Sequence, residues 1–226
     1  MDVYVSRFTA WAPGFTGAEN WKSWARGERE IPKTQESPSL EYADPLFRRR
    51  LSQISRMTIQ VIHDIQPIGE NTKIVFVSLR GEVSQQLKIN RMLIEDEDLK
   101  PAAFSLSVFN TPPALATIAL QLTSGYSAVY PSGDRFDSGF LAAAAGVLSG
   151  AAGEALLVYA DELCPADYGK LGACRFSDLQ GSYEPFAFAA LLTGDGRGIP
   201  AFVNGNPPET PGLFLKNLYG SRELYV

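Results

Sequence analysis

Apolar positions are densest between Phe104 and Gly150, where their spacing predicts short strands alternating with helices. The series is a strand at Phe104–Phe109, a turn at 110–111, a helix at Pro112–Leu122, a strand at Tyr126–Tyr130, a turn at 131–134 and a helix at Phe140–Leu148. The first helix is apolar on nearly every side, and the second is rich in alanine, with Gly146 offering close approach to another backbone. A helix that is apolar all round must be covered all round. We therefore expect both helices to lie inside a layered structure or at a subunit interface.

The flanking segments continue this alternation. Asp44 followed by Pro45 predicts a helix start, because aspartate caps the first amide groups and proline fits the first turn. Apolar residues at three- and four-residue spacing extend that helix to Pro67. The acidic run Glu95–Asp98 opposes the dipole of a helix C-terminus, so the helix that begins near Val83 should end before it. The other predicted elements are strands at Val3–Trp11, Lys73–Leu79, Ala155–Ala160 and Phe186–Thr193, helices at Asn20–Glu30 and Val83–Ile94, and loops or turns at 31–43, 161–182 and 194–198.

Short apolar strands alternating with helices indicate an α/β layered fold. A chain of 226 residues is long enough to bury one sizeable core, so we expect a single domain over residues 1–226. Residues 200–226 show no periodicity that assigns them to an element.

The composition limits the kinds of molecule that the chain is expected to bind. Hydrophobic residues make up 45% of the chain and charged residues 20%, and the formal net charge is −5. This balance disfavours binding to nucleic acid or to an anionic membrane surface. The N-terminal residues lack the basic and apolar regions of a secretory signal, and Phe140–Ala160 is too broken by small and polar residues to span a bilayer. We therefore expect a cytoplasmic protein with no membrane insertion.

The sequence gives little indication of a metal site or of redox-active cysteines. His63 is the sole histidine, which excludes a site of several histidines within the chain. Adjacent helix residues point about 100° apart, so His63 and Asp64 should not form a dyad. Cys164 and Cys174 match no zinc or redox spacing and are either two thiols or one local disulfide. We expect no metal and no cofactor.

Two polar features carry alternative interpretations. Arg48, Arg49 and Arg50, with Arg56 on the same predicted helix, form either a solvated face or a docking patch for an acidic partner such as a carrier protein. The glycines of 194–198 indicate a turn, because no strand-loop-helix context for a phosphate loop surrounds them.

Ser132 lies in a tight turn between a predicted strand and a predicted helix. A helix N-terminus favours an anionic nucleophile there, but a serine hydroxyl also needs a positioned base, and none is evident. The surrounding residues, YPSGD, do not match the Gly-x-Ser-x-Gly motif. Ser132 is therefore either a structural serine or an active one.

Several motifs, taken in order, resemble the N-terminal half of the β-ketoacyl synthases. They are the early helix RRLSQISRM at 49–57, then FSLSVFN at 104–110, the apolar helix to Leu122, Gly125-Tyr126-Ser127 and Ser132-Gly133. The chain is also similar in length to the chain-length-factor-like proteins of aryl polyene gene clusters. The resemblance implies the thiolase fold, a five-layer α-β-α-β-α arrangement of two similar halves, of which this chain resembles the first.

The resemblance also defines what differs from an active synthase. In active members a cysteine begins the buried helix, and Ser132 falls near that place. No cysteine occurs between Lys100 and Leu163. The two catalytic histidines of the family come from the second half. We therefore expect a chain that does not condense acyl groups by itself, because thioester attack and decarboxylation lack their usual groups.

Family members dimerise through the strand before that cysteine and the helix next to it. The resemblance assigns the interface strand to Ser127, Ala128, Val129 and Tyr130. It assigns the wall of a partner's acyl tunnel to Ala114, Leu115, Ile118 and Gln121, for which ordinary core packing is the alternative. Pairing of the strand across a pseudo-twofold axis would remove an exposed sheet edge.

The hypothesis that follows is a catalytically silent, chain-length-factor-like subunit. It would form a heterodimer or heterotetramer with a full-length ketosynthase in polyketide, aryl polyene or fatty-acid-like synthesis. Acyl carrier protein would reach the complex through the partner. One alternative is a serine acyltransferase or thioesterase that uses Ser132, and another is a homodimeric scaffold that binds carrier protein through Arg48–Arg50.

Overall fold

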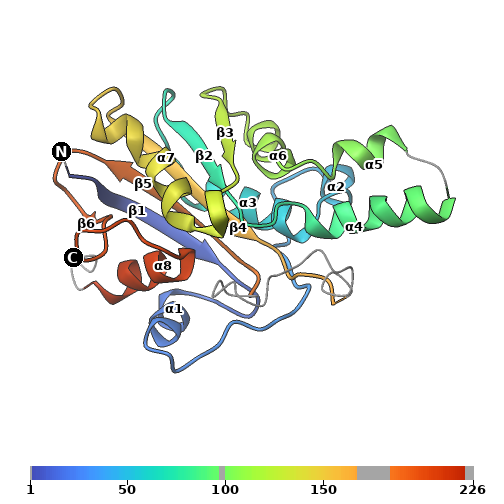
Figure 1. The fold of residues 1–226 in the computed structure, drawn as a ribbon, viewed down its shortest axis with the longest axis horizontal. Coiled ribbons are helices and arrows are strands. Elements are labelled where there is room, and N and C mark those ends of the chain that lie inside the picture. The colour runs from blue at the N-terminus through green and yellow to red at the C-terminus, as the bar shows by residue number, and fades with distance from the viewer. Residues whose placement is uncertain (1, 97–99, 167–183, 222–226) are drawn as a thin grey trace.

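The computed structural model describes residues 2–96, 100–166 and 184–221. Within these residues a six-stranded mixed sheet, in the order β3-β2-β4-β5-β1-β6, forms the centre of the molecule (Figure 1). β2 is parallel to both β3 and β4, whereas β5 is antiparallel to β4 and to β1. The strands are β1 Tyr4–Trp11, β2 Lys73–Val77, β3 Tyr126–Val129, β4 Glu154–Asp161, β5 Phe186–Thr193 and β6 Ile199–Pro200.

Helices cover both faces of this sheet. The described helices are α1 Ala18–Ala25, α2 Pro45–Arg48, α3 Gln53–Asp64, α4 Val83–Arg91, the π-helical η1 Met92–Asp96, α5 Pro101–Ser105, α6 Thr111–Ala119, the 3₁₀ turn η2 Ser132–Asp134, α7 Phe136–Leu148 and α8 Pro211–Gly220. Alternate residues of β4 point to opposite faces. Leu157 and Tyr159 join the core under α7, α1 and α8, and Leu156 and Val158 join the core under α3 and α6. The α/β layered fold predicted from the sequence is confirmed.

Aromatic rings fill the face covered by α7 and α8. Phe214 of α8 lies 5.4 Å from Phe188, 5.7 Å from Phe140 and 6.1 Å from Phe136, measured between ring centroids. All four side chains are fully buried. The close approach of α7 to the sheet depends on Gly139 rather than on Gly146, because a Cβ at Gly139 would lie 2.6 Å from Val77 Cγ1.

Asp161, at the end of β4, holds the turn that follows β2. Ser78 Oγ and the Arg80 N–H donate to its Oδ1 at 2.6 and 3.1 Å. The Tyr159 hydroxyl and the Leu79 N–H donate to its Oδ2 at 2.5 and 3.3 Å. Burial raises the pKa of Tyr159 well above its usual range, and the neighbouring Asp161 carboxylate adds to the rise. The carboxyl ends of two parallel strands are thus joined by one fully buried carboxylate.

Five strand predictions are confirmed to within a few residues, but the predicted strand Phe104–Phe109 is wrong. Pro101 instead begins the short helix α5, with Lys100 extended before it, and the chain then turns into α6. The run lies outside the sheet, and Phe104 is 52% exposed. A pattern typical of a strand had no neighbouring strand with which to pair.

Helix boundaries also differ from the sequence prediction. Asp44 caps α2 as expected, accepting from the Leu46 and Phe47 amides, but α2 ends at Arg48. Ser52 begins α3 as a separate helix, because its hydroxyl accepts from the Ser55 N–H.

The remaining helices differ in length and in exposure. The helix that starts at Val83 continues as η1 through Asp96 instead of ending before the acidic run, since Glu95 is exposed and water weakens its repulsion with the dipole. α7 begins four residues earlier than predicted, and α8 was not predicted. Neither α6 nor α7 is buried on every side, for Ile118 is 67% and Leu141 39% exposed. No described helix has the length and apolarity that crossing a membrane demands.

Replacing Phe214 by alanine should lower the free energy of unfolding by about 3–5 kcal/mol, because a large cavity would open in the aromatic cluster. Leu213→Ala, one residue earlier on α8 and 41% exposed, is the matched control and should cost under about 1 kcal/mol. Urea unfolding measures both values. Equal losses for the two variants would show that the cluster does not anchor α8.

Asp161→Asn should lower the unfolding free energy by about 3 kcal/mol, since the amide nitrogen would face hydroxyl and N–H donors that now meet a carboxylate. Asp195→Asn is the control: Asp195 accepts from Thr193 and Arg197 in an exposed turn. Thermal unfolding of both variants provides the comparison, and a midpoint for Asp161→Asn as high as that of the control would contradict the assignment.

Candidate functional site

β3 forms one end of the sheet and pairs with β2 alone among the described strands. The Ile74 N–H donates to Gly125 O, and Ile74 lies opposite Tyr126. In a parallel pair with this register, the N–H groups of Tyr126 and Ala128 point away from β2. Ser127, Ala128 and Val129 are half-buried, and Tyr130 is 56% exposed. The edge thus presents backbone hydrogen-bonding groups next to an exposed aromatic ring.

α6 lies beside this edge. The residues predicted to line the tunnel fall into two groups, one towards solvent and one towards the core. Ala114 and Ile118, one turn apart, share a helix face, and Ile118 is largely exposed. Gln121 is exposed just after the helix, in a left-handed conformation with φ of 54°. Leu115 instead packs against the core under α3, which is the ordinary core role.

Exposed apolar side chains also occur on a helical arm near α6. Figure 1 shows α4, η1 and α5 projecting from the body on the side of β3 and α6. Leu93 is 44%, Ile94 79% and Phe104 52% exposed on this arm. Large apolar side chains gathered on one side of a molecule are typical of a protein–protein interface.

Ser132 is exposed in η2, four residues before α7 begins. Its N–H donates to Ser138 Oγ at 3.0 Å. In the described part of the chain, no acidic or basic side chain forms a hydrogen bond with Ser132 Oγ. The first residue of α7 is Phe136, which is fully buried and donates its N–H to Glu209 O at 3.2 Å. A buried phenyl ring, rather than a nucleophile, therefore begins the helix.

The arginine patch differs from the prediction, because Arg48 ends α2, Arg49 and Arg50 lie in the turn after it, and Arg56 is on α3. Arg48 donates to Ser39 O at 3.1 Å, and Arg56 donates to Pro38 O at 2.9 Å and to Arg48 O at 2.6 Å. These two side chains hold the preceding loop against α2 and α3. Arg49 and Arg50 are exposed.

His63 and Asp64 do meet, contrary to the sequence prediction. His63 Nδ1 lies 3.0 Å from Asp64 Oδ1, so flexible side chains overcome the divergence of adjacent Cα–Cβ bonds. Tyr42 stacks on His63 with 3.8 Å between ring centroids. Burial raises the pKa of Tyr42, and the Asp64 carboxylate adds to the rise. Both members of the pair are partly exposed at the end of α3.

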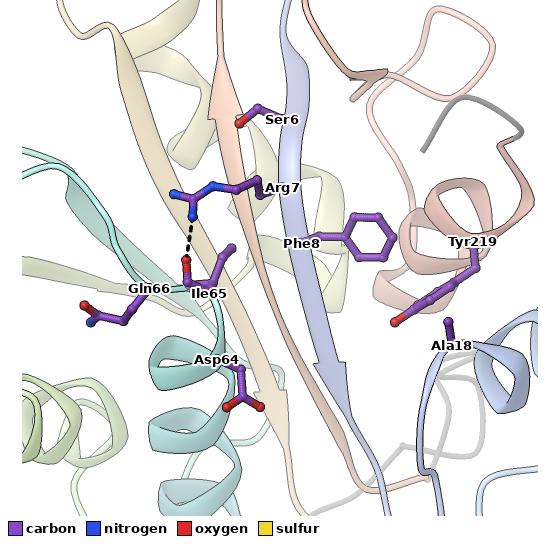
Figure 2. A pocket seen from close by; sticks show the side chains of 8 residues that line it. All are labelled: Ser6, Arg7, Phe8, Ala18, Asp64, Ile65, Gln66 and Tyr219. Carbon is purple, nitrogen blue, oxygen red and sulfur yellow. Dashed lines mark hydrogen bonds between the residues drawn. The ribbon is translucent and has the colours of Figure 1, made fainter. Parts of the chain in front are cut away.

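A shallow groove of about 380 Å³ crosses β1 between the end of α3 and α8. Figure 2 shows Arg7 reaching from β1 towards Ile65, and Phe8 facing Tyr219. Arg7 donates to Ile65 O at 3.1 Å and to Pro67 O at 2.5 Å, and the rings of Phe8 and Tyr219 are 4.9 Å apart. These contacts join elements of the chain to one another, and they identify the groove as a structural junction.

The sequence analysis did not identify a pair of buried carboxylates, Glu82 and Glu162, each 1% exposed. Ser52 Oγ and Ser55 Oγ donate to Glu82 Oε1 at 2.8 and 2.5 Å. Burial raises the pKa of Glu82 to about 8, and the charge of Glu162 adds to the rise while the two serines oppose it. Burial likewise raises the pKa of Glu162 to about 7, against the lowering effect of the Ser84 N–H, 2.8 Å away. A single acidic residue after an apolar strand carries no periodic signal that would reveal such a pair.

Metal ligands do not gather in the described ranges, where no three histidine, cysteine, aspartate or glutamate side chains are placed to hold an ion. Cys174 lies outside the described residues, so the choice between two thiols and one disulfide stays a prediction. The predicted loop at 161–182 lies mostly outside them as well.

Comparison with known proteins accounts for this arrangement. The model of the β-ketoacyl synthase N-terminal domain matches residues 21–206. No curated protein sequence matches the chain. A structure of the ketosynthase ApeO in complex with its chain length factor ApeC, from Xenorhabdus doucetiae, is similar with a TM-score of 0.74 and 24% identity, covering 98% of this chain and 93% of that one.

Two further structures share the fold at lower coverage. The ishigamide ketosynthase/chain length factor matches with a TM-score of 0.62 and 15% identity, over 89% of this chain and 65% of that chain. A β-ketoacyl synthase from Burkholderia phymatum STM815 matches with a TM-score of 0.57 and 13% identity, over 85% and 59%. These likenesses confirm the thiolase-like fold in its N-terminal half. The family model matches residues 21–206, and the similar structures share the arrangement of sheet and helices. This chain therefore belongs to the β-ketoacyl synthase family through its N-terminal domain.

Proposed function

We propose that this chain is a chain-length-factor-like subunit that pairs with a complete ketosynthase and shapes the acyl tunnel of that partner. The observation that carries the proposal is the open edge of β3 beside the exposed apolar side chains of α6. An unpaired strand edge next to apolar side chains is a liability in an isolated protein, and a partner strand would remove it.

The backbone of β3 is suited to such pairing. The N–H groups of Tyr126 and Ala128 point away from β2 and would donate to a partner strand. Antiparallel pairing across a pseudo-twofold axis would continue one sheet through both subunits. Ile118, Tyr130 and Phe104 would be covered in the same step.

Catalysis would remain with the partner. The stretch between Lys100 and Leu163 has no cysteine, and the start of α7 is occupied by the buried ring of Phe136. A thiolate at this helix start would be the acyl acceptor, and a phenyl ring offers neither a nucleophile nor a proton.

The tunnel role rests on the helix face that Ala114 and Ile118 share, with exposed Gln121 just beyond the helix. Ala114 is small and half-buried, so it would leave room for a long, flat acyl chain such as a polyene. The similar complexes are described as a ketosynthase with its chain length factor. The proposed complex would act in polyketide or aryl polyene synthesis, on growing acyl chains. Acyl carrier protein would bind mainly to the partner, with Arg49 and Arg50 as an accessory basic contact.

Ile118→Asp should weaken association with the ketosynthase by about 1–3 kcal/mol, because a carboxylate would be buried without a partner. The chain is co-expressed with a tagged complete ketosynthase from the source genome, and the co-purified fraction is quantified. Leu213→Asp, on α8 and far along the sequence from the interface, is the control and should co-purify like wild type. A wild-type chain that purifies as a homodimer and ignores the ketosynthase would reject the proposal.

Ala114→Phe should shorten the products of the assembled complex while leaving association intact, since the added ring would project towards the acyl chain. Ala145→Phe, at an exposed alanine of α7, serves as the control. Mass spectrometry of the released acyl chains gives the length distribution. An unchanged distribution in Ala114→Phe would assign this residue to packing only.

A further inference from the structure

Glu82 and Glu162 are both buried where α3 and α4 begin. Glu82 is the N-cap residue of α4, and its Oε1 accepts from two hydroxyls in the first turn of α3. Glu162 follows β4, and its Oε1 accepts from the Ser84 N–H in the first turn of α4. The two carboxyl groups therefore join α3, α4 and the end of β4, at the base of the arm formed by α4, η1 and α5.

Ionising both groups at once is unfavourable in this position. Glu82 Oε2 is buried and has no hydrogen-bond partner among the residues that the structure describes. An ionised Glu82 would hold charge on an oxygen that no donor compensates, next to a second carboxylate of the same sign. Asp161 shows the contrast, because four donors surround its two oxygens.

Within the described residues, the charges that act on the pair do not offset this cost. The other ionisable groups described at this junction are Asp161 and Tyr159 of β4 and Arg80 of the turn after β2. Asp161 raises the pKa of Glu162, and Arg80 acts on Tyr159. From α3 and α4 come serine hydroxyls and backbone N–H groups, which favour a carboxylate but do not cancel burial.

We propose that Glu82 and Glu162 form a proton-binding pair that fastens the base of the arm, and that loss of its protons loosens α4 from α3 and β4. Protonated, the pair is neutral and keeps its serine and amide contacts. Deprotonated, it places two like charges in a buried junction. Outward movement of the α4 N-terminus would relieve this repulsion, because Glu82 is the N-cap residue of α4.

The direction of the pH effect follows from linkage. Both carboxyls have pKa values raised from 4.5, to about 8 for Glu82 and about 7 for Glu162. Between pH 4.5 and 8 the folded protein binds more protons than the unfolded chain, so stability falls as the pH rises through this window. This contribution is fully present below pH 4.5 and lost above pH 8.

The arm carries the exposed side chains of Leu93, Ile94 and Phe104, and Phe104 belongs to the apolar surface assigned above to the ketosynthase. Loosening the arm would weaken that association, so the complex should be tighter at pH 6 than at pH 9. This consequence rests on the proposed function, whereas the proton-binding pair itself does not.

The first experiment uses the isolated chain. Glutamate labelled with ¹³C at the side-chain carboxyl is followed by NMR from pH 4 to 10, and Glu82→Gln and Glu162→Gln identify the two resonances. Two carboxyls should titrate above pH 6. Hydrogen exchange of residues 83–96, corrected for the intrinsic rate, should rise about tenfold or more from pH 6 to 9. Glu82→Gln should flatten this rise, and Glu41→Gln, an exposed control, should keep it.

Wild-type spectra in which every glutamate titrates below pH 5.5 would overturn the proposal without any variant. So would a rise in exchange that is the same in Glu82→Gln and wild type. Binding of the complete ketosynthase at pH 6 and 9 is then measured for the wild type and Glu82→Gln. Failure to bind at either pH contradicts the proposed function and leaves the pair standing, whereas equal binding at both pH values contradicts the link from the pair to the partner.

Discussion

Burial of an aromatic cluster between α7, α8 and the sheet is the interaction on which the rest of the fold depends. A sheet with two apolar faces needs a layer on each, and α3 and α6 supply one of them. The other face is closed by α7 and by Phe214 of α8, whose ring meets Phe136, Phe140 and Phe188. Burying rings of this size contributes several kcal/mol, a large fraction of the stability of a domain.

The same cluster also determines which side chain begins α7. Phe136 occupies the first position of α7 and is fully buried among other rings. A side chain in that position serves packing of the core. In contrast to this buried cluster, the edge of β3 is exposed, with the side chains of Ile118 and Tyr130 beside it. The structure thus combines a closed interior with an open edge.

The sequence predicted those parts of the fold whose signal is local. Apolar runs such as Phe186–Thr193 lie in strands. All eight residues of this run are buried, as expected for a strand covered on both faces. Asp44 caps a helix as expected. Phe104–Phe109 shows the limit of this reasoning, since strand formation requires a neighbouring strand and the topology provides none there. The contact of His63 with Asp64 depends on side-chain rotamers, which spacing along a helix does not determine.

The candidate site was predictable only in part, for a related reason. The motifs that resemble the synthase family located β3 and α6, but not which of their residues face solvent. Leu115 and Ile118 look alike in the sequence, yet one packs inward and the other is exposed. Glu82 and Glu162 are 80 positions apart in the numbering, so that only the folded chain brings them together.

The central claim is that the outer edge of β3 is completed by a strand from a ketosynthase. A structure of the chain bound to a complete ketosynthase tests it most directly. We predict backbone hydrogen bonds from Tyr126 and Ala128 to an antiparallel strand of the partner, with Ile118 covered. A complex in which that edge stays open to solvent, with the partner bound elsewhere, would contradict the account.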